Sequence, residues 1–597
     1  VAAVADLPVA EPVVEAVADL PVAEPVVAPI AVAAPADAVA DLLPVTGEAV
    51  DASAGTNPTV PADSPLSWTM LAAARRDPLT ASAVAAPLPP VPIPGGCTQT
   101  STACALIFGP SGVPVPTGRY ALNAQNLYLN QFMPAGYDSQ IVFSPEGAYP
   151  VTGIKNLALP ISANQGLQIL INTLQVLQPD NTANPIPITI FGFSQSAVIS
   201  SLLQRELEAN PDLLPGVDRS QLSFVTVGQE MSPNGGWFAR FPGFNTPSLG
   251  EFFYGSTGYA SATDTGAPQF AYPTVNYTLE YDGFADSPRY PLNFLSALNA
   301  AMGILFTHIN YNSPNYFTNT YGTDPIAVDG PAKACADGSS SYCSELPVAG
   351  SPDQKYYFIQ TPDLPLLAPL RLLPLIGNPL ADLIQPVLKV IVDLGYGDPA
   401  HGFTSATQPD ANVALPFGLF PDVNPAEILT RLVDGVGQGV SDFFGAFGPN
   451  GSVQQEISSI GQNLIPSLGA LQLPNVNDLL TDVQNGIVNI ASRISAGASA
   501  LYATLLATAD FINAGLISLP AYDISLFIDG LKQTIGGDPI QGLINAIGRP
   551  VAADVGMLAT ITVVQVAVWL EGLFAAVTGC GPAAPTAGLC VIPGVGP

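Results

Sequence analysis

The chain has 597 residues, which suggests about two to four structural units, and 48% of them are hydrophobic, enough for a sizeable core. Lys and Arg total 16 against 47 Asp and Glu, which gives a formal net charge of −31. A chain this acidic is repelled by nucleic-acid phosphates and by anionic lipid headgroups. The composition therefore excludes a nucleic-acid-binding role, and any lipid contact is expected to be hydrophobic.

The first 64 residues predict a disordered arm. A unit of 13 residues occurs twice, at 3–15 and 16–28, and Ala, Val, Pro and acidic residues dominate it. Regularly spaced prolines prevent a long helix, and no aromatic residue precedes Trp68 to pack a core. Residues 65–96 predict a short helix and a Pro-rich linker. The chain begins with Val and no leader pattern follows, so we expect any signal peptide to have been removed.

Residues 97–423 predict an α/β domain. Short apolar runs alternate with stretches of helical spacing, and this alternation is typical of a parallel sheet covered on both faces. The predicted strands are 105–109, 140–143, 187–191, 222–227 and 277–281, and the predicted helices are 166–177, 196–209 and 293–305. Residues 232–275 are rich in Gly, Pro, Ser and aromatic residues without a clear period, which suggests a lid or a substrate-facing insertion.

Residues 424–597 predict a mainly helical C-terminal region without a catalytic constellation. The expected helices lie at 427–436, 453–464, 476–509 and 542–577. The apolar run 555–570 is shorter than the about 20 residues that a transmembrane span needs. We interpret it as part of a buried helix, with a membrane-associated helix as the alternative.

The six cysteines form three pairs that are close in sequence, which predicts three disulfides and an oxidising compartment. The alternative is six buried free thiols. No C-x-x-C spacing occurs and neither of the two histidines lies near a cysteine pair, so we expect no metal site and no cofactor. The pairs are Cys97 with Cys104, Cys335 with Cys343, and Cys580 with Cys590.

The strongest chemical signal is the segment Gly192-Phe-Ser194-Gln-Ser196, directly between a predicted strand and a predicted helix. A serine hydroxyl becomes a useful nucleophile when a sharp strand–turn–helix exposes it and a base serves it. Gly192 suits the crowding at such a turn, and Ser196 stands where a second Gly is more usual. The segment predicts Ser194 as the nucleophile; the alternative is a serine that only caps the helix.

The base and the acid follow from chain order, which in α/β-hydrolases is nucleophile, acid, histidine. The chain offers only His308 and His401, and we prefer His308, which follows the helix after the fifth strand. Asp282 ends that strand and Asp286 lies in the loop beyond it. We prefer Asp286 as the acid, because a loop carboxylate can reach back to the imidazole, and keep Asp282 as the alternative.

The oxyanion hole needs two backbone donors. We expect one to be the N–H of Gln195, at the start of the helix. The second should come from the loop after the first strand, where Pro110 has no N–H. This leaves Ser111 or Gly112, and we prefer Ser111.

Together these residues resemble the PE-PPE domain of mycobacterial cell-envelope proteins, a serine α/β-hydrolase module related to cutinases. The resemblance covers roughly residues 105–425, and Ser196 in place of Gly is similar to what the family shows. No N-terminal PE or PPE helical module is expected, because the repeat arm stands in its place. The matching features are the turn 108–116, GFSQSA at 192–197, YDGFADSPRYPLN at 281–293, His308 with Tyr311, and LGYGD at 394–398.

The resemblance implies that Ser194 is the nucleophile, that His308 is the base, and that an Asp within 282–286 is the acid. It further implies a secreted or cell-envelope enzyme that hydrolyses or transfers acyl esters of envelope lipids. We therefore expect an acyl lipid or glycolipid as substrate, contact with the envelope or a membrane surface, and no nucleic-acid partner. The alternatives are a non-catalytic envelope scaffold and a lipid-binding protein built on the same fold.

Overall fold

The computed structural model describes most of the chain beyond the linker. Several predicted segments lie outside the described residues: the arm at 1–64, the linker up to residue 95 and the Cys580–Cys590 pair. Most of the two predicted helices at 453–464 and 476–509 also lies outside them. The described residues are 96–153, 156–179, 185–215, 217, 219–257, 272–349, 353–402, 411–449, 451–454, 498 and 501–578.

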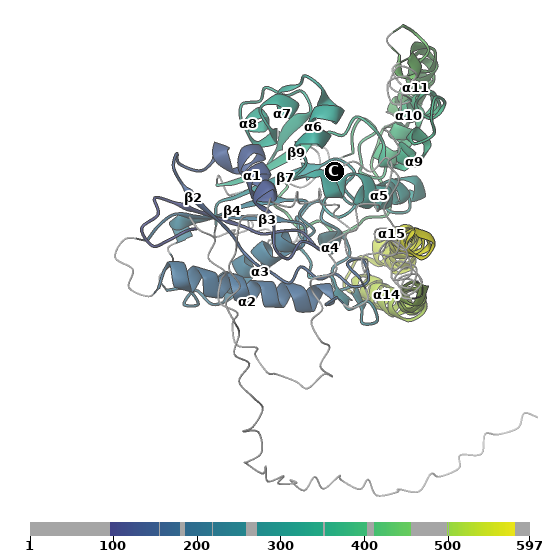
Figure 1. The fold of residues 1–597 in the computed structure, drawn as a ribbon. Coiled ribbons are helices and arrows are strands. Elements are labelled where there is room, and N and C mark those ends of the chain that lie inside the picture. The colour runs from purple at the N-terminus through teal and green to yellow at the C-terminus, as the bar shows by residue number, and fades with distance from the viewer. Residues whose placement is uncertain are drawn as a thin grey trace, which may run out of the picture. The chain divides into compact units, whose positions relative to one another are not determined.

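A seven-stranded sheet forms the centre of this part of the chain, with the order β2-β1-β3-β4-β7-β9-β8 (Figure 1). All neighbouring strands pair in parallel except β8, which is antiparallel to β9 at the edge. The strands are β1 (Cys104–Ile107), β2 (Asp138–Ile141), β3 (Ile188–Phe193), β4 (Leu222–Val227), β7 (Thr274–Leu279), β8 (Cys343–Leu346) and β9 (Gln354–Ile359). Two short strands, β5 (Asn245–Thr246) and β6 (Glu251–Phe252), form a separate antiparallel pair.

Helices cover both faces of the sheet because successive strand side chains point to opposite faces. Leu106 and Ile190 pack in one core with α2 (Leu159–Leu177) and α3 (Gln195–Ala209). Their neighbours Ile107 and Phe191 face the other core, with α1 (Gly118–Leu127), α6 (Pro314–Tyr321), α7 (Pro325–Val328) and α8 (Pro331–Ala336). Figure 1 shows these two layers on opposite sides of the strands. The central strands β3 and β4 are consequently buried along almost their whole length and mostly apolar, as parallel strands usually are.

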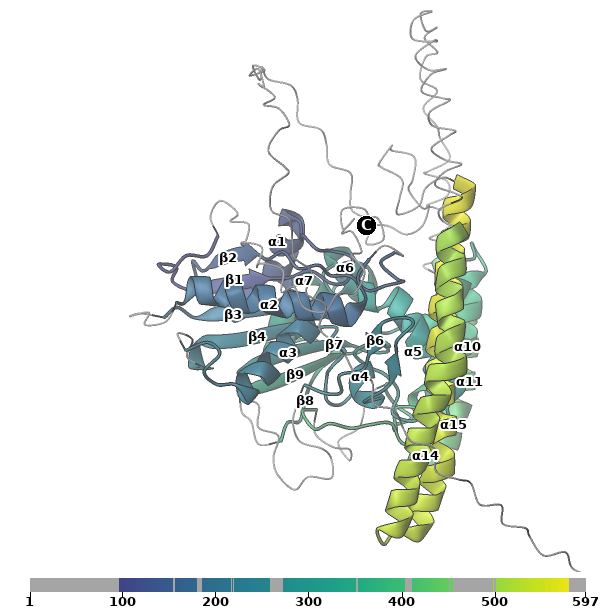
Figure 2. The same cartoon turned by 90° about the horizontal axis from the view of Figure 1, so that it is seen from below.

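Further helices follow the sheet along the chain and pack beside it. Among them α10 pairs with α11, α14 pairs with α15, and both α10 and α15 pack against α5, as the view from below shows (Figure 2). Their bounds are α4 (Trp237–Arg240), α5 (Phe294–Phe306), α9 (Ala368–Arg371), α10 (Gly377–Asp393), α11 (Pro425–Gly445), α14 (Leu519–Ile535) and α15 (Pro539–Thr578). Short 3-10 turns lie at Leu129–Gln131, Arg219–Gln221, His308–Asn310 and Pro365–Leu367, and a π-helical turn lies at Ala514–Ser518.

The α/β-hydrolase type of core and the helical C-terminal region agree with the sequence prediction. The sequence did not predict β8, β9 or α10. The predicted apolar run 555–570 lies in α15, which buries Ala559 and Val563 but exposes Trp569 and Leu570. Two helical segments, Leu501–Ile535 and Pro539–Leu570, are long and apolar enough to cross a membrane by length and composition alone.

Two predicted disulfides fall within the described residues, and both are formed. Cys97 bonds Cys104 at the start of β1, with a Cα–Cα distance of 5.6 Å. Cys335 bonds Cys343 between α8 and β8, with a Cα–Cα distance of 5.4 Å. Each joins a sheet strand to the segment before it.

The strand order also determines where a site is expected. From β1 the chain moves outward to β2, and then crosses back to β3 on the other side of β1. At such a switch point the loops leave a crevice at the carboxyl ends of the strands. The turn after β1 and the turn that carries Ser194 after β3 both lie at this crevice.

Candidate active site

Ser194 occupies a strained turn between β3 and α3. Its φ of 57° and ψ of −121° lie in a region that residues other than Gly rarely adopt, and its side chain makes no capping hydrogen bond to the helix. A Cβ at Gly192 would lie 2.6 Å from the backbone oxygen of Ser196, so only Gly fits there. Ser196 Oγ instead makes the local bonds, accepting from Phe193 N at 2.8 Å and donating to Phe193 O at 3.0 Å. The turn therefore leaves the Ser194 hydroxyl for another partner.

His308 and Asp282 form a buried hydrogen-bonded pair. The Asp282 carboxylate lies 3.0 Å (Oδ1) and 2.8 Å (Oδ2) from His308 Nδ1. The same carboxylate accepts from the Tyr311 hydroxyl at 2.8 Å and from Phe284 N at 3.0 Å. Burial lowers the pKa of His308, but Asp282, with a smaller contribution from Glu230, more than offsets this effect, and the pKa of His308 is raised above its ordinary value. A carboxylate on Nδ1 holds the proton there and turns Nε2 into the acceptor that a general base needs.

The carboxylate that the sequence analysis preferred lies elsewhere. Asp286 Oδ2 accepts from the backbone N–H of Tyr281 at 2.9 Å, and the Asp286 carbonyl accepts from the Tyr396 hydroxyl. Burial raises the pKa of Asp286 well above its usual range, which favours a neutral carboxyl inside the turn. The geometry thus favours the alternative, Asp282, as the partner of His308. Asp286 instead stabilises the turn through its hydrogen bonds to Tyr281 and Tyr396.

The other histidine candidate is at a different point of the fold. His401 Nε2 lies 3.5 Å from Asp398 Oδ2, three residues before it in the chain. Its neighbour Gly402 donates its N–H to Glu280 Oε1 at 2.7 Å. The structure therefore brings His308, and not His401, to Asp282.

The two predicted oxyanion donors lie next to one another. Ser111 Oγ donates to Gln195 Oε1 at 2.9 Å, which joins the loop after β1 to the first residue of α3. As the first helical residue, Gln195 has an N–H without a carbonyl acceptor inside the helix. The N–H of Gly112 bonds the carbonyl of Glu146 at 2.7 Å, which leaves Ser111 as the candidate second donor.

The sequence analysis missed the carboxyl group that contacts Ser194. Ser194 Oγ donates to Glu230 Oε1 at 3.2 Å, and both side chains are buried. His308 Nε2 is also buried and has no hydrogen-bond partner among the described residues. Burial is the main cause that raises the pKa of Glu230 to about 7, while His308 and the Ser194 hydroxyl lower it and Asp282 raises it. No motif marks Glu230; its only sequence signal is its place just beyond a predicted strand.

A second missed carboxyl, Glu146, lies behind the loop after β1. Its side chain is fully buried, and its φ of 46° is in the left-handed region. Burial raises the pKa of Glu146 to about 8; the Ser144 hydroxyl lowers this pKa, and Glu230 raises it. The site therefore contains more buried carboxyl groups than a Ser-His-Asp arrangement requires.

Aromatic rings cover the imidazole. The Phe284 ring lies edge-on to His308 with 4.8 Å between centroids, and Phe193 lies 5.4 Å from His308. Trp237 is 5.6 Å from Phe284 and 4.5 Å from Phe253, so the described part of the 232–275 insertion continues this aromatic wall. These rings place apolar surface against the imidazole of His308.

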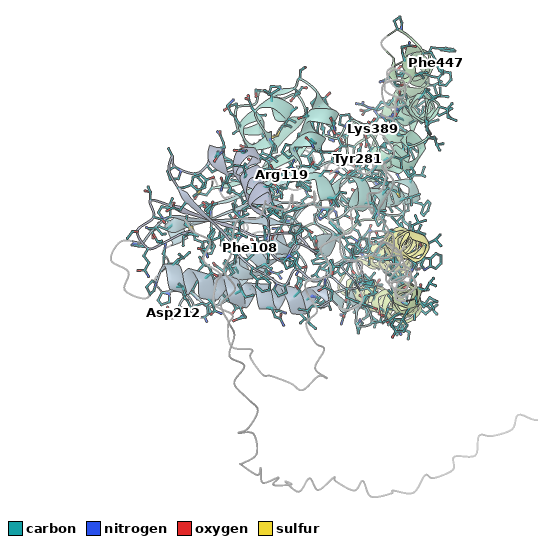
Figure 3. The ribbon with its side chains drawn as sticks, viewed as in Figure 1. Phe108, Arg119, Asp212, Tyr281, Lys389 and Phe447 are labelled. Carbon is teal, nitrogen blue, oxygen red and sulfur yellow. A yellow bond between two sulfur atoms is a disulfide. The ribbon has the colours of Figure 1, made fainter. Side chains whose placement is uncertain are left out.

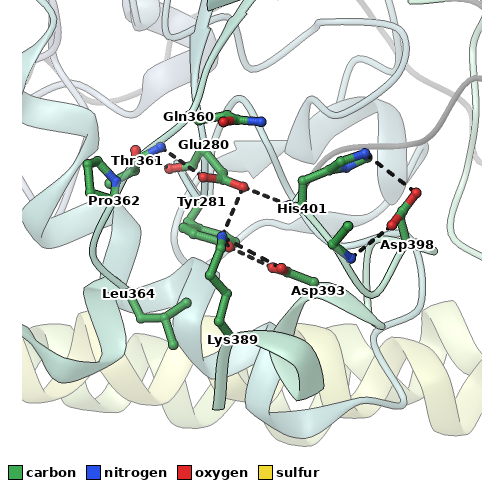
Figure 4. Close-up of polar contacts among 12 residues, drawn as sticks. Glu280, Tyr281, Gln360, Thr361, Pro362, Leu364, Lys389, Asp393, Asp398 and His401 are labelled. Carbon is green, nitrogen blue, oxygen red and sulfur yellow. Dashed lines mark hydrogen bonds and ion pairs between the residues drawn. The ribbon is translucent and has the colours of Figure 1, made fainter. Parts of the chain in front are cut away.

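A buried ionic cluster fixes the strand end that carries Asp282. Lys389 of α10 hydrogen-bonds the Tyr281 hydroxyl, lies 3.3 Å from Glu280 Oε1, and lies 3.6 Å from Asp393 Oδ2 (Figures 3 and 4). The Tyr281 hydroxyl donates to Asp393 Oδ1 at 2.6 Å, and the φ of Tyr281 is 64°. Burial raises the pKa of Asp393 to about 7, with Lys389 opposing and Glu280 reinforcing this rise. The cluster ties α10 to the strained residue immediately before Asp282.

The sheet, the strained serine turn and the His308–Asp282 pair are the features of an α/β-hydrolase core. Residues 134–397 match the family model of the PE-PPE domain, in agreement with the resemblance seen in the sequence. Two relatives are proteins of Mycobacterium tuberculosis that belong to the PPE and PE groups. The PPE family protein PPE28 is 42% identical over 462 residues, 76% of this chain and 63% of the relative, and Esterase PE16 is 35% identical over 337 residues, 56% of this chain and 54% of the relative.

A more distant relative from the same organism is named SL1278 acyltransferase Chp1. It is 25% identical over 258 residues, which cover 43% of this chain and 53% of the relative. The chain thus matches between about half and 63% of the length of these proteins. The family and the two disulfides are consistent with an extracellular location.

Proposed function

We propose that the chain is an exported serine esterase or acyltransferase that acts on acyl esters of cell-envelope lipids. The observation that carries the proposal is the hydrogen-bonded His308–Asp282 pair beside a serine held at a φ of 57°. Relatives named as an esterase and an acyltransferase support the reaction class. The proposal assigns Ser194 as nucleophile, His308 as base and Asp282 as acid.

The chemistry proceeds through an acyl-enzyme. Ser194 Oγ attacks the ester carbonyl while His308 Nε2 takes the hydroxyl proton, and the carbonyl electron pair moves onto its oxygen. The N–H groups of Gln195 and Ser111 stabilise that oxyanion. When the tetrahedral intermediate collapses, the leaving alcohol takes the proton from His308, and water or an acceptor hydroxyl then releases the acyl group by the reverse sequence.

The choice of an acyl lipid as substrate rests on the apolar surroundings of the site. Phe284 and Trp237 are partly exposed and offer aromatic surface for a hydrocarbon chain, and a site shielded from water favours transfer to an acceptor over hydrolysis. The described C-terminal helices also expose large apolar side chains, including Ile524 and Ile535 of α14. We propose that these side chains contribute to contact with a lipid surface, which fits a protein with too few cations for electrostatic attachment.

One cavity favours a second candidate function, lipid binding without catalysis. A cavity of about 520 Å³ lies between the loops after α4 and the helix α14, and its lining includes Pro242, Phe417, Tyr522, Leu526 and Arg549. If the hydrolase core is only a scaffold, the S194A variant should bind acyl lipid as the wild type does, and no serine should react with an active-site probe.

Labelling with a fluorophosphonate probe tests the catalytic proposal. We expect the wild type to label, S194A not to label, and H308A to label at least about 100-fold more slowly, because loss of the base removes proton transfer. The matched control is H401A, which removes the other histidine of the chain and should label at the wild-type rate. Absence of labelling in the wild type would refute the serine-enzyme proposal and favour the scaffold.

A further inference from the structure

In this structure the hydroxyl of Ser194 is hydrogen-bonded to a carboxyl group and not to His308, its proposed base. Ser194 Oγ donates to Glu230 Oε1 at 3.2 Å, whereas His308 Nε2 has no hydrogen-bond partner in the part of the chain that the structure describes. A serine hydroxyl has a single proton to donate. While Glu230 is ionised, the bond to Glu230 and a bond to His308 Nε2 are therefore mutually exclusive states of Ser194.

The position of Glu230 is fixed by the backbone. It follows β4 through Gly228, whose φ is 61° and at which a Cβ would lie 2.9 Å from His308 Cε1. The chain thus passes directly against the imidazole ring before it reaches Glu230. The Glu230 carbonyl accepts from Phe238 N in α4 at 3.1 Å, which holds the residue from its other side.

The groups around Glu230 make its charge important for the base. It lies among Ser194, His308 and Asp282, and it also interacts with the buried carboxyl of Glu146. Asp282 and Glu230 both stabilise the imidazolium form of His308, in that order of strength, against the opposing effect of burial. Two interacting groups of this kind take up protons as a pair.

We propose that Glu230 is a positioning residue that holds the Ser194 hydroxyl in the resting enzyme and, through its charge, controls the protonation of His308. This inference rests on the proposed function of Ser194 and His308. On substrate binding the hydroxyl turns from Glu230 to His308 Nε2, and its proton then passes to that nitrogen as the bond from Oγ to the acyl carbon forms. Glu230 itself gains and loses no proton in this step.

The variant E230Q removes the charge while it preserves the shape and an acceptor oxygen. A neutral amide is a weaker acceptor for Ser194 and does not stabilise imidazolium. Because the pKa of Glu230 is raised to about 7, the wild type carries this negative charge above pH 7 and very little of it at pH 5.5. We therefore expect E230Q to label faster than the wild type between pH 7 and pH 8, by up to about tenfold, the effect of one pKa unit, and at a similar rate at pH 5.5. E230A should change the rate in the same direction.

The matched control is E206Q, which makes the same chemical change at an exposed position of α3. Its labelling profile should equal that of the wild type. An E230Q profile that coincides with the wild type, or slower labelling at every pH, would overturn the inference, because Glu230 would then have no effect or would assist the attack.

A titration by NMR provides a readout that does not depend on activity. The chain has two histidines, so the ring C–H signals of His308 are assigned by comparison with H308A, and His401 serves as the internal reference. We expect the His308 pKa to fall in E230Q by about one unit, with His401 unmoved. An unchanged His308 pKa would refute the role of Glu230. If the wild-type protein fails to label at any pH, the proposed function is refuted, but the role of Glu230 is not, because the NMR titration still tests whether Glu230 controls the pKa of His308.

Discussion

Replacement of each of the two candidate acids by asparagine separates their roles. Asp282 accepts from His308 Nδ1, the Tyr311 hydroxyl and Phe284 N, all within 3.0 Å. In D282N an amide faces Nδ1, so the imidazole loses its negative partner and can adopt the tautomer with the proton on Nε2, where it cannot act as a base. We expect kcat/KM for a short acyl ester to fall by about 10³- to 10⁴-fold, or about 4 to 5 kcal/mol of transition-state stabilisation.

The matched variant is D286N. Burial raises the pKa of Asp286 well above its usual range, so an amide resembles the neutral carboxyl that the turn already holds. The side-chain oxygen of the introduced asparagine can still accept from Tyr281 N, and we expect kcat/KM to change by less than about tenfold because no interaction with His308 is lost.

The assay is steady-state hydrolysis of a short acyl ester, with fluorophosphonate labelling of the same preparations as a check that the serine remains accessible. A thermal melt of each variant separates loss of the base from loss of the fold. If D286N lost as much activity as D282N while remaining folded, or if D282N lost less than about tenfold, the assignment of Asp282 as the acid would be wrong.

Three further variants test the buried groups. Burial raises the pKa of Glu146 from 4.5 to about 8, so the folded state keeps a proton that the unfolded chain releases. This difference stabilises the fold by on the order of 5 kcal/mol at low pH, and the stabilisation is lost as the pH rises to 8. The melting temperature of E146Q should therefore fall less between pH 5 and pH 8 than that of the wild type. K389M should lower the unfolding free energy by about 3 kcal/mol in thermal melts, more at pH 8 than at pH 5, because Asp393 ionises around pH 7 and then lies near Glu280 without the compensating cation. G192A places a Cβ 2.6 Å from the Ser196 carbonyl oxygen, so displacement of the turn should slow fluorophosphonate labelling by at least about 100-fold.

Each of these three predictions would be contradicted by a specific result. An E146Q protein with the wild-type slope of melting temperature against pH would show that Glu146 titrates normally in the folded state. A K389M protein that melts like the wild type at pH 8 would mean that water, and not Lys389, compensates the neighbouring carboxylates. Full labelling of G192A would show that the turn tolerates a side chain, and would remove the geometric argument for Ser194.

The strained turn at Ser194 was predictable because its requirements are local. A buried apolar strand, a Gly, a serine and an amphipathic helix occur in direct succession around Ser194, and each follows from residue type and period. His308 was preferred over His401, the other histidine of the chain, because it follows the helix after the fifth predicted strand. The central strands β1, β3 and β4 were recognisable for the same local reason, as continuous apolar runs between turn residues.

The choice of acid depended on the direction of a turn, which spacing does not reveal. Tyr281 adopts a φ of 64°, and the N–H of Asp286 closes back on the Asp282 carbonyl at 2.6 Å. This tight turn aims Asp282 at the end of α5 and folds Asp286 inward to Tyr281 N. The conformation is held by Lys389, more than 100 residues away in the chain, so no local pattern predicts it.

By itself, the sequence determined the class of fold, the disulfide pairs within the described residues and the position of the strand–turn–helix at Ser194, because period, composition and short-range spacing govern these features. Only the tertiary structure showed that Asp282 hydrogen-bonds His308 and that Glu230 hydrogen-bonds Ser194. The β3–β4 pairing brings the end of β4 beside the serine turn, and with it a carboxyl that no motif marks. Contacts of this kind arise from parallel strands that are neighbours in space and distant in sequence, and their chemistry depends on burial that exists only once the sheet is covered.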